Sequence, residues 1–154
     1  MNDRTAHPAL VALEPLVGEW EMEASVDGTA MARGRTTFEW MEGRAFLIQH
    51  ADAEAAGDEW RDSSPFPVTT IIGVDDSSGE LVMLYADARE VFRIYRMSLA
   101  DGHWKVWRDD PGFFQRFVAE LSEDRRTIDG HWESSPDGAT WALDFDMTYR
   151  RTGE

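Results

Sequence analysis

The sequence has no cysteine and little basic charge. Because cysteine is absent from all 154 residues, disulfide bonds and thiolate metal sites are excluded. Lysine and arginine together number 15 against 30 aspartates and glutamates, which gives a net charge of -15. Nucleic acid and anionic membranes repel a surface of that sign. We therefore expect neither of them as a partner.

Long apolar runs are also missing. No segment approaches the roughly 20 apolar residues that a membrane-spanning helix needs. The first residues, 1–7, are polar and lack the basic-then-apolar order of a secretory signal. These absences predict a cytoplasmic protein. With 42% hydrophobic residues, the composition is that of a globular chain, and the length predicts a single domain over 1–154.

Catalytic and metal-binding motifs are absent as well. The chain has no Gly-x-Ser-x-Gly elbow and no glycine-rich phosphate loop. The 4 histidines are scattered without metal-ligand spacing. His50 and Asp52 would share a strand face and suit a general-base pair, although such a pair at a strand end is usually an ordinary surface feature. We assign no catalytic residue, metal or cofactor.

Turn-forming residues occur at short, regular intervals, as at Asp27-Gly28, Asp101-Gly102 and Pro111-Gly112. The segments between them have strand length and are rich in β-branched and aromatic residues. We predict a short helix-like segment from Pro8 to Leu16. The predicted strands are 17–26, 34–41, 44–52, 67–75, 80–87, 90–100, 103–110, 113–122, 126–134 and 139–151. About ten short antiparallel strands indicate an all-β sandwich or closed barrel.

Alternation along the strands separates an acidic outer face from an aromatic inner face. In the last strand, Phe145, Met147 and Tyr149 alternate with polar residues, which is typical of a half-buried strand. Five tryptophans fall on the predicted inner face: Trp20, Trp40, Trp104, Trp132 and Trp141. They either fill the core or line an apolar cavity.

Polar residues share this inner face. Arg108 follows the register of Trp104 and Val106, and Gln115 lies between two phenylalanines. Buried polar groups are costly unless they are paired or hydrated, so several together favour a cavity with ligand contacts. The alternative is an internal salt-bridge network that includes Asp87. The predicted ligand-binding residues are Trp40, His50, Tyr85, Arg93, Tyr95, Trp104, Arg108, Gln115 and Trp132.

The connection from Ala53 to Pro67 is longer than a plain hairpin loop. It carries Trp60 and Phe66 in otherwise polar surroundings. Two interpretations remain open. The segment is either a surface loop anchored by an aromatic residue or a lid over the open end of the barrel.

Several segments in order resemble the lipocalin-like, or calycin, proteins, in a bacterial branch close in plan to fatty-acid-binding proteins and nitrobindins. They span nearly the whole chain and are the Gly18-x-Trp20 opening, 38–49, 107–117 and 144–149. The resemblance implies an up-and-down β-barrel of about ten strands, closed at one end by a short N-terminal helix, with a ligand inside. It also implies that a basic residue of the last strand, here Arg151, lies over Trp20.

The resemblance has two departures. Many lipocalins are secreted, whereas this chain shows no secretory signal. Nitrobindins hold heme through a histidine near the C-terminal end of the barrel, but the segment 139–151 contains no histidine. A heme site would need His50 or His131 to face inward.

Three functions therefore compete. The first is a binding protein for a small hydrophobic or amphipathic molecule, and a homodimer is compatible with the sequence. The second is an enzyme that uses His50, Asp87 or Tyr95 as proton carriers in the same cavity. The third is a heme barrel. The sequence favours the first function.

Overall fold

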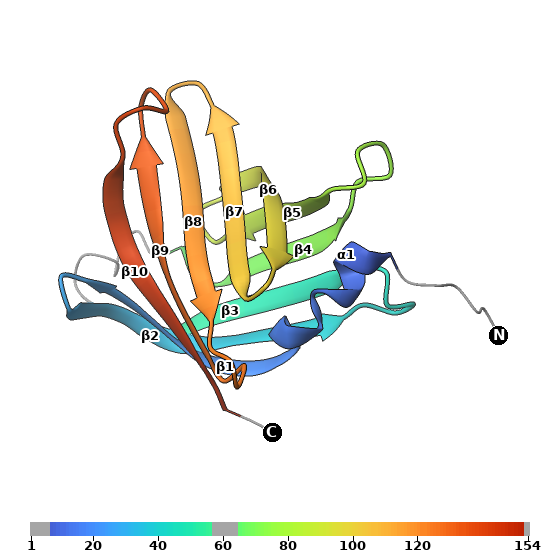
Figure 1. Cartoon of the computed structure of the whole chain (residues 1–154). Helices are drawn as coiled ribbons and strands as arrows, with labels where there is room; N and C mark the ends of the chain where they lie inside the picture. Colours follow the sequence, from blue (N-terminus) through green and yellow to red (C-terminus); the bar gives the residue numbers. More distant parts are fainter. Residues whose placement is uncertain (1–6, 57–64, 153–154) are drawn as a thin grey trace.

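The computed structural model describes residues 7–56 and 65–152, and its strands form a closed antiparallel barrel (Figure 1). Each strand pairs with its neighbours in the chain, and β1 pairs with β10 to close the barrel. The elements are α1 (Pro8–Val11), η1 (Glu14–Leu16), β1 (Gly18–Val26), β2 (Thr29–Trp40), β3 (Leu47–Ala56), β4 (Val68–Val74), β5 (Leu81–Asp87), β6 (Phe92–Ala100), β7 (His103–Asp110), β8 (Phe113–Leu121), β9 (Thr127–Ser135) and β10 (Ala142–Arg151).

The predicted fold class is confirmed, and most predicted strands match observed ones to within three residues. Two are longer than predicted. β2 begins at Thr29, because Asp27 and Gly28 have φ values of 50° and 80° and so form a tight turn that brings β1 and β2 together at once. β3 continues to Ala56 and takes up part of the predicted loop. No helix in the described part of the chain has the length and apolarity to cross a bilayer.

One end of the barrel, which we call the floor, is closed by the N-terminal segment. Leu13, Leu16 and Trp20 are fully buried there. The Trp20 indole Nε1 donates a hydrogen bond to the Leu16 carbonyl at 2.9 Å. The Arg151 guanidinium lies 4.1 Å from the Trp20 ring centroid, which confirms the predicted pairing.

Arg151 also joins the last strand to the entering chain. Its Nη1 and Nη2 donate to the carbonyls of Val17 and Pro15 at 2.7 and 2.6 Å. Gly18 has a φ of +132°, and a Cβ at this position would lie 2.5 Å from Arg151 Nη1. Gly18 therefore makes room for this guanidinium.

Cross-strand register arranges the interior of β7 to β10 in rows. Val106, Phe117, Trp132 and Phe145 are successive partners and form an aromatic-rich row. Nearer the floor, Gly130 leaves space for that row, because a Cβ there would lie 2.8 Å from the Phe117 ring. On the other side of the row, the inner face carries polar residues.

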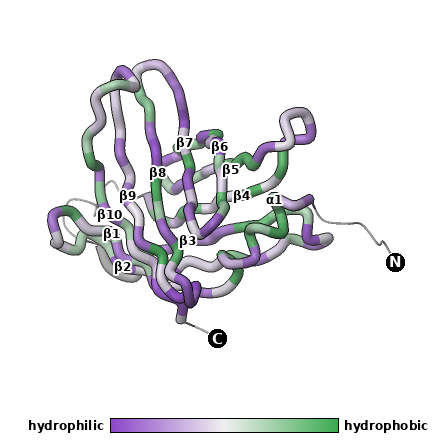
Figure 2. Tube along the Cα trace, in the orientation of Figure 1, coloured by the Kyte–Doolittle hydropathy of each residue, from purple (hydrophilic) through white to green (hydrophobic). Residues whose placement is uncertain are grey.

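The predicted register of β3 is inverted. Leu47, Gln49 and Ala51 are buried, so Ile48 and His50 face outward. The pattern misled because this part of the outer face is also apolar, and a shift of one residue exchanges the two faces. A row of paired isoleucines and leucine crosses the outside of four strands: Ile48, Ile71, Leu84 and Ile94. Figure 2 shows hydrophobic and hydrophilic residues alternating along the strands.

The start of β10 also differs from the prediction. An irregularity between Leu143 and Phe145 interrupts the pairing with β9. Leu143 is 48% exposed, and Trp141 packs on the Arg116 guanidinium at 3.9 Å. Trp141 is therefore not part of the inner face. The bulge adds one residue to β10. The residues before it therefore lie on the opposite face from the one that strict alternation predicts.

Candidate functional site

A cavity of about 320 Å³ lies inside the barrel above the aromatic row. Cavities that hold small ligands typically measure roughly 300–1,000 Å³, so this one suits a compact molecule. Its wall is mainly apolar and aromatic, with polar side chains from several strands. The lining residues are Met22, Gln49, Ala51, Pro65, Phe66, Val68, Thr70, Met83, Tyr85, Arg89, Arg93, Tyr95, Trp104, Val106, Phe113, Gln115, Phe117, Trp132, Asp144, Phe145, Met147 and Tyr149.

The aromatic side of the cavity is continuous. The ring centroids of Trp104 and Phe117 are 5.1 Å apart, and those of Phe117 and Trp132 are also 5.1 Å apart. Tyr95 continues the series at 5.8 Å from Trp132. Packed rings of this kind form a rigid apolar surface. The sequence left open whether the aromatic residues fill the core or line a cavity, and the structure shows that they do both.

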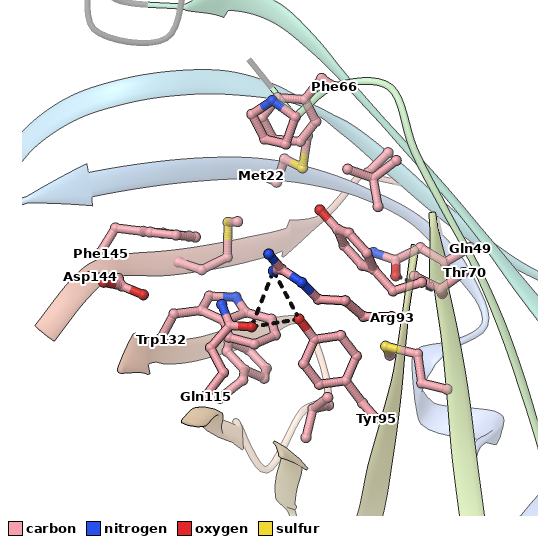
Figure 3. A pocket seen from close by; sticks show the side chains of 18 of the residues that line it. Met22, Gln49, Phe66, Thr70, Arg93, Tyr95, Gln115, Trp132, Asp144 and Phe145 are labelled. Atoms are coloured by element: carbon pink, nitrogen blue, oxygen red, sulfur yellow. Dashed lines mark hydrogen bonds between the residues drawn. The ribbon is translucent and has the colours of Figure 1, made fainter. Parts of the chain in front are cut away.

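A polar cluster adjoins this surface (Figure 3). The Tyr95 hydroxyl donates to Gln115 Oε1 at 2.6 Å. Arg93 Nη1 lies 3.4 Å from the same oxygen and 3.5 Å from the Tyr95 hydroxyl. Contacts of this length are weak hydrogen bonds. Burial raises the pKa of Tyr95, although Arg93 opposes the shift, so the phenol stays protonated at neutral pH.

Three arginines lie near Tyr95, but two of them have carboxylate partners. Arg89 Nη2 is 2.6 Å from Asp87 Oδ2, and Arg108 Nη2 is 2.5 Å from Asp110 Oδ2. Among the described residues Arg93 has no carboxylate partner, and its guanidinium lies 5.0 Å from the Phe113 ring centroid. Arg93 therefore brings an uncompensated positive charge to the cavity.

Asp87 belongs to a closed pair rather than to the salt-bridge network considered from the sequence. Its side chain is fully buried, and it also accepts a hydrogen bond from the Tyr85 hydroxyl at 2.7 Å. Burial alone would raise the pKa of Asp87, but hydrogen bonds from Arg89 and Tyr85 outweigh it and lower the pKa. Burial raises the pKa of Tyr85 in turn, and Asp87 adds to that shift. The carboxylate stays ionised and bound.

Sequence reasoning missed a second polar group, on the opposite wall. Gln49 is buried, donates to Thr36 Oγ1 at 3.0 Å and accepts from Thr70 Oγ1 at 3.0 Å. It also forms a hydrogen bond with the buried Tyr149 hydroxyl. The inverted register of β3 concealed Gln49, since the prediction placed its neighbour His50 inside. This group satisfies its own hydrogen bonds and adds polarity without charge.

Asp144 was missed for a different reason. Strict alternation with Phe145 places it outside, but the bulge in β10 brings its carboxylate to the cavity wall. It accepts a hydrogen bond from Ser134 Oγ at 3.0 Å. Nothing in the local sequence signals a bulge at this point.

The structure brings six of the nine predicted residues together around the cavity: Tyr85, Arg93, Tyr95, Trp104, Gln115 and Trp132. Trp40 lies elsewhere, near the floor, where its Nε1 donates to Glu14 Oε1 at 3.1 Å. His50 is exposed on the outer face together with Asp52. Their predicted places on the cavity wall are therefore wrong.

Arg108 is placed at the right register but not in the cavity. The pairing of β6 and β7 ends at Arg96 and Trp107, and Arg108 lies just beyond that point. Its side chain is 23% exposed and lines a separate crevice that shares Tyr95 with the cavity. Its Nε atom is buried without a hydrogen-bond partner. Its position therefore does not support the prediction that Arg108 binds a ligand in the cavity.

Two further expectations concern the mouth of the barrel and heme. Phe66 lines the cavity, whereas Trp60 lies outside the described residues, so the lid remains a hypothesis. None of the histidines lines the cavity: His7, His50, His103 and His131. The cavity residues do not fit a heme held by histidine. Within 7–56 and 65–152, no cluster of three histidines or carboxylates could hold a metal ion.

The enzyme hypothesis loses its proton carriers for similar reasons. His50 faces outward, Asp87 is held ionised by Arg89, and Tyr95 is held protonated by burial. A general acid or base works best when its pKa is near the working pH. These three residues therefore do not form an acid–base pair.

Fold and cavity together define a class: a ten-stranded closed antiparallel barrel with an aromatic-walled internal cavity. Within this class, the crystal structure of Rv2717c from M. tuberculosis is similar, with a TM-score of 0.62. The two chains share 15% identity, and the match covers 97% of this chain and 100% of that chain. Such a similarity shows the fold alone. No protein-family model and no curated protein matches the sequence.

Proposed function

We propose that this protein binds a small amphipathic molecule that carries an anionic group. The apolar part of the ligand lies on the row formed by Phe117, Trp132 and Phe145. The anionic group lies at Arg93, beside Tyr95 and Gln115. We also propose that the barrel belongs to the lipocalin-like group, because the Gly18, Trp20 and Arg151 arrangement at its floor has the form that the resemblance implies.

The observation that carries the proposal is the state of Arg93. A guanidinium in a half-buried apolar setting is costly unless an anion or several acceptors satisfy it. Here two long contacts to neutral oxygens are its hydrogen bonds among the described residues. An anionic ligand would supply the missing partner, and the planar fork of donors suits a carboxylate.

The cavity size restricts the rest of the ligand. A volume of about 320 Å³ accommodates a single ring system or a medium-length chain. The neutral network around Gln49 and Thr70 faces the same space and offers no further cation. The preferred ligand is therefore a compact monoanion.

Composition supports the remaining parts of the proposal. An acidic chain without cysteine is suited to the cytoplasm, which keeps thiols reduced and needs no disulfides. The same net charge of -15 argues against nucleic acid and anionic membranes as partners.

The test uses 1-anilinonaphthalene-8-sulfonate as a fluorescent probe and displaces it with octanoate or with octanol. Arg93→Met should weaken octanoate binding by about tenfold, which corresponds to ~1.4 kcal/mol, and leave octanol unchanged. Arg96→Met is the matched control, because Arg96 is on the same strand and exposed on the outer face. Equal octanoate affinity in the wild type and Arg93→Met would overturn the proposal.

A further inference from the structure

We propose that Asp144 forms a second polar subsite in the cavity, which binds a hydrogen-bond donor at the far end of the ligand. The inference rests on the proposed function and narrows it. The ligand class becomes a small aromatic carboxylic acid that carries a hydroxyl or amine group away from the acid. Arg93 takes the carboxylate, and Asp144 takes the donor.

The first argument is the bulge that places Asp144. Without it, the alternation set by Phe145, Met147 and Tyr149 would put the Asp144 side chain on the outer face. The bulge instead brings a carboxylate inside and moves Leu143, an apolar residue, to a position where it is 48% exposed. Both changes are unfavourable for folding alone. Bulges that redirect a side chain are common beside binding sites.

The second argument is the hydrogen bonding of the carboxylate. An ionised carboxylate offers about four acceptor positions. The structure supplies one donor to Asp144, the Ser134 hydroxyl at 3.0 Å. Among the described residues no cation pairs with it, in contrast to Asp87, which is bound by Arg89 and Tyr85. Asp144 therefore retains acceptor capacity that faces the cavity.

The third argument is the placement of the two charges. Arg93 Nη1 reaches Gln115 on β8, and Gln115 is the register partner of Ser134 on β9, which contacts Asp144 on β10. Two strand spacings of ~4.8 Å, on the order of 10 Å, thus separate the β8 backbone at Gln115, whose side chain Arg93 reaches, from the β10 backbone that carries Asp144. In Figure 3 the Trp132 side chain lies beside the space that separates Arg93 from Asp144. A single benzene ring with an acid on one side and a donor on the other spans such a gap.

The geometry also selects against related molecules. An α-amino acid without a donor in its side chain carries both groups on one carbon and would leave one subsite unfilled. A dicarboxylic acid would bring a second anion against Asp144, and like charges repel in a site of low dielectric. An arylacetate without a further donor pairs with Arg93 and leaves the Asp144 carboxylate with its hydrogen bond from Ser134 alone.

The test compares 4-hydroxyphenylacetate with phenylacetate, which differ by the one hydroxyl group. Each is used to displace 1-anilinonaphthalene-8-sulfonate from the full chain. The wild type should bind 4-hydroxyphenylacetate about tenfold more tightly, the size expected for a hydrogen bond to a charged acceptor. Asp144→Ala should abolish this preference and leave phenylacetate affinity within about twofold. Asp146→Ala, two residues further along the same strand, should retain the preference.

The outcomes separate this inference from the proposed function. If the wild type binds both acids equally, or if Asp144→Ala keeps the preference, the Asp144 subsite is wrong and the anion site at Arg93 stands. If neither acid binds the wild type and octanoate also fails, the proposed function itself is wrong. Should Asp144→Ala unfold, Asp144→Asn replaces it. The amide keeps the shape and an acceptor oxygen but removes the charge, so the preference for 4-hydroxyphenylacetate should fall well below tenfold.

Discussion

Each end of the barrel has an arginine beside aromatic rings, but the two arginines differ in how fully they are hydrogen-bonded. At the floor, Arg151 lies over Trp20 and donates to backbone carbonyls at 2.6–3.1 Å. Towards the mouth, Arg93 lies beside Phe113 and Tyr95 with contacts of 3.4 and 3.5 Å. The first guanidinium is saturated by the protein itself, whereas the second is not.

The difference separates structural from functional polarity. A satisfied polar group near the core rigidifies the structure, whereas an unsatisfied one lowers stability until a ligand supplies its partner. The floor is also where the N-terminal segment, β1 and β10 meet. The mouth contains two irregular parts of the barrel, the bulge in β10 and the early end of pairing between β6 and β7.

The largest expected effect tests the floor. Trp20→Ala should lower the free energy of unfolding by ~3–5 kcal/mol, because it removes a fully buried indole and leaves a cavity beneath Arg151. The urea midpoint measures the loss. Trp107→Ala is the control, since Trp107 belongs to the outer face of β7 and should cost much less. If the two variants lost the same free energy of unfolding, Trp20 would contribute no more to stability than a tryptophan of the outer face.

A smaller effect tests the boundary between floor and mouth. Gly130→Ala introduces a Cβ 2.6 Å from that of Ala119 and 2.8 Å from the Phe117 ring. Overpacking of this kind costs ~1–3 kcal/mol. Because Phe117 must shift towards the cavity, probe binding should weaken as well. Phe117→Leu in the same chain should recover part of the stability. A Gly130→Ala variant as stable as the wild type would mean that the aromatic row has room to spare.

The sequence predicted the barrel well because its strands carry redundant signals. Turns such as Asp27-Gly28 fix the hairpins, and alternation in β7 and β8 is clear, so the pattern placed Trp104 and Gln115 on the inner face, where the structure also has them. Where one face is apolar and the other polar, register follows from the pattern. The Trp20 and Arg151 pair followed from the resemblance.

The candidate site was predicted less well because its residues depend on exceptions to alternation. In β3, apolar residues on both faces removed the signal, so His50 was placed inside instead of Gln49. In β10, the bulge that brings in Asp144 has no local signature. Arg108 was placed at the right register, but the separation of β6 from β7 arises from tertiary geometry, and this separation removes Arg108 from the cavity.

The smallest expected effect tests the mouth and concerns Arg108. Its ion pair with Asp110 is partly exposed on both sides, and pairs of that kind contribute roughly 0–1 kcal/mol. Arg108→Met also removes the Nε donor that is buried without a partner, which offsets part of that loss. We expect the free energy of unfolding to change by less than ~1 kcal/mol and octanoate affinity to stay within about twofold of the wild type. Arg93→Met, measured in parallel, should lose octanoate affinity at similar stability. A tenfold loss in Arg108→Met instead would make Arg108 the anchor and would mean that the ligand enters the crevice between β6 and β7. The positive charge that binds the ligand would then lie in the barrel wall rather than in the cavity. The incompletely hydrogen-bonded arginine of the mouth, which the comparison sets against Arg151 of the floor, would then be Arg108 and not Arg93.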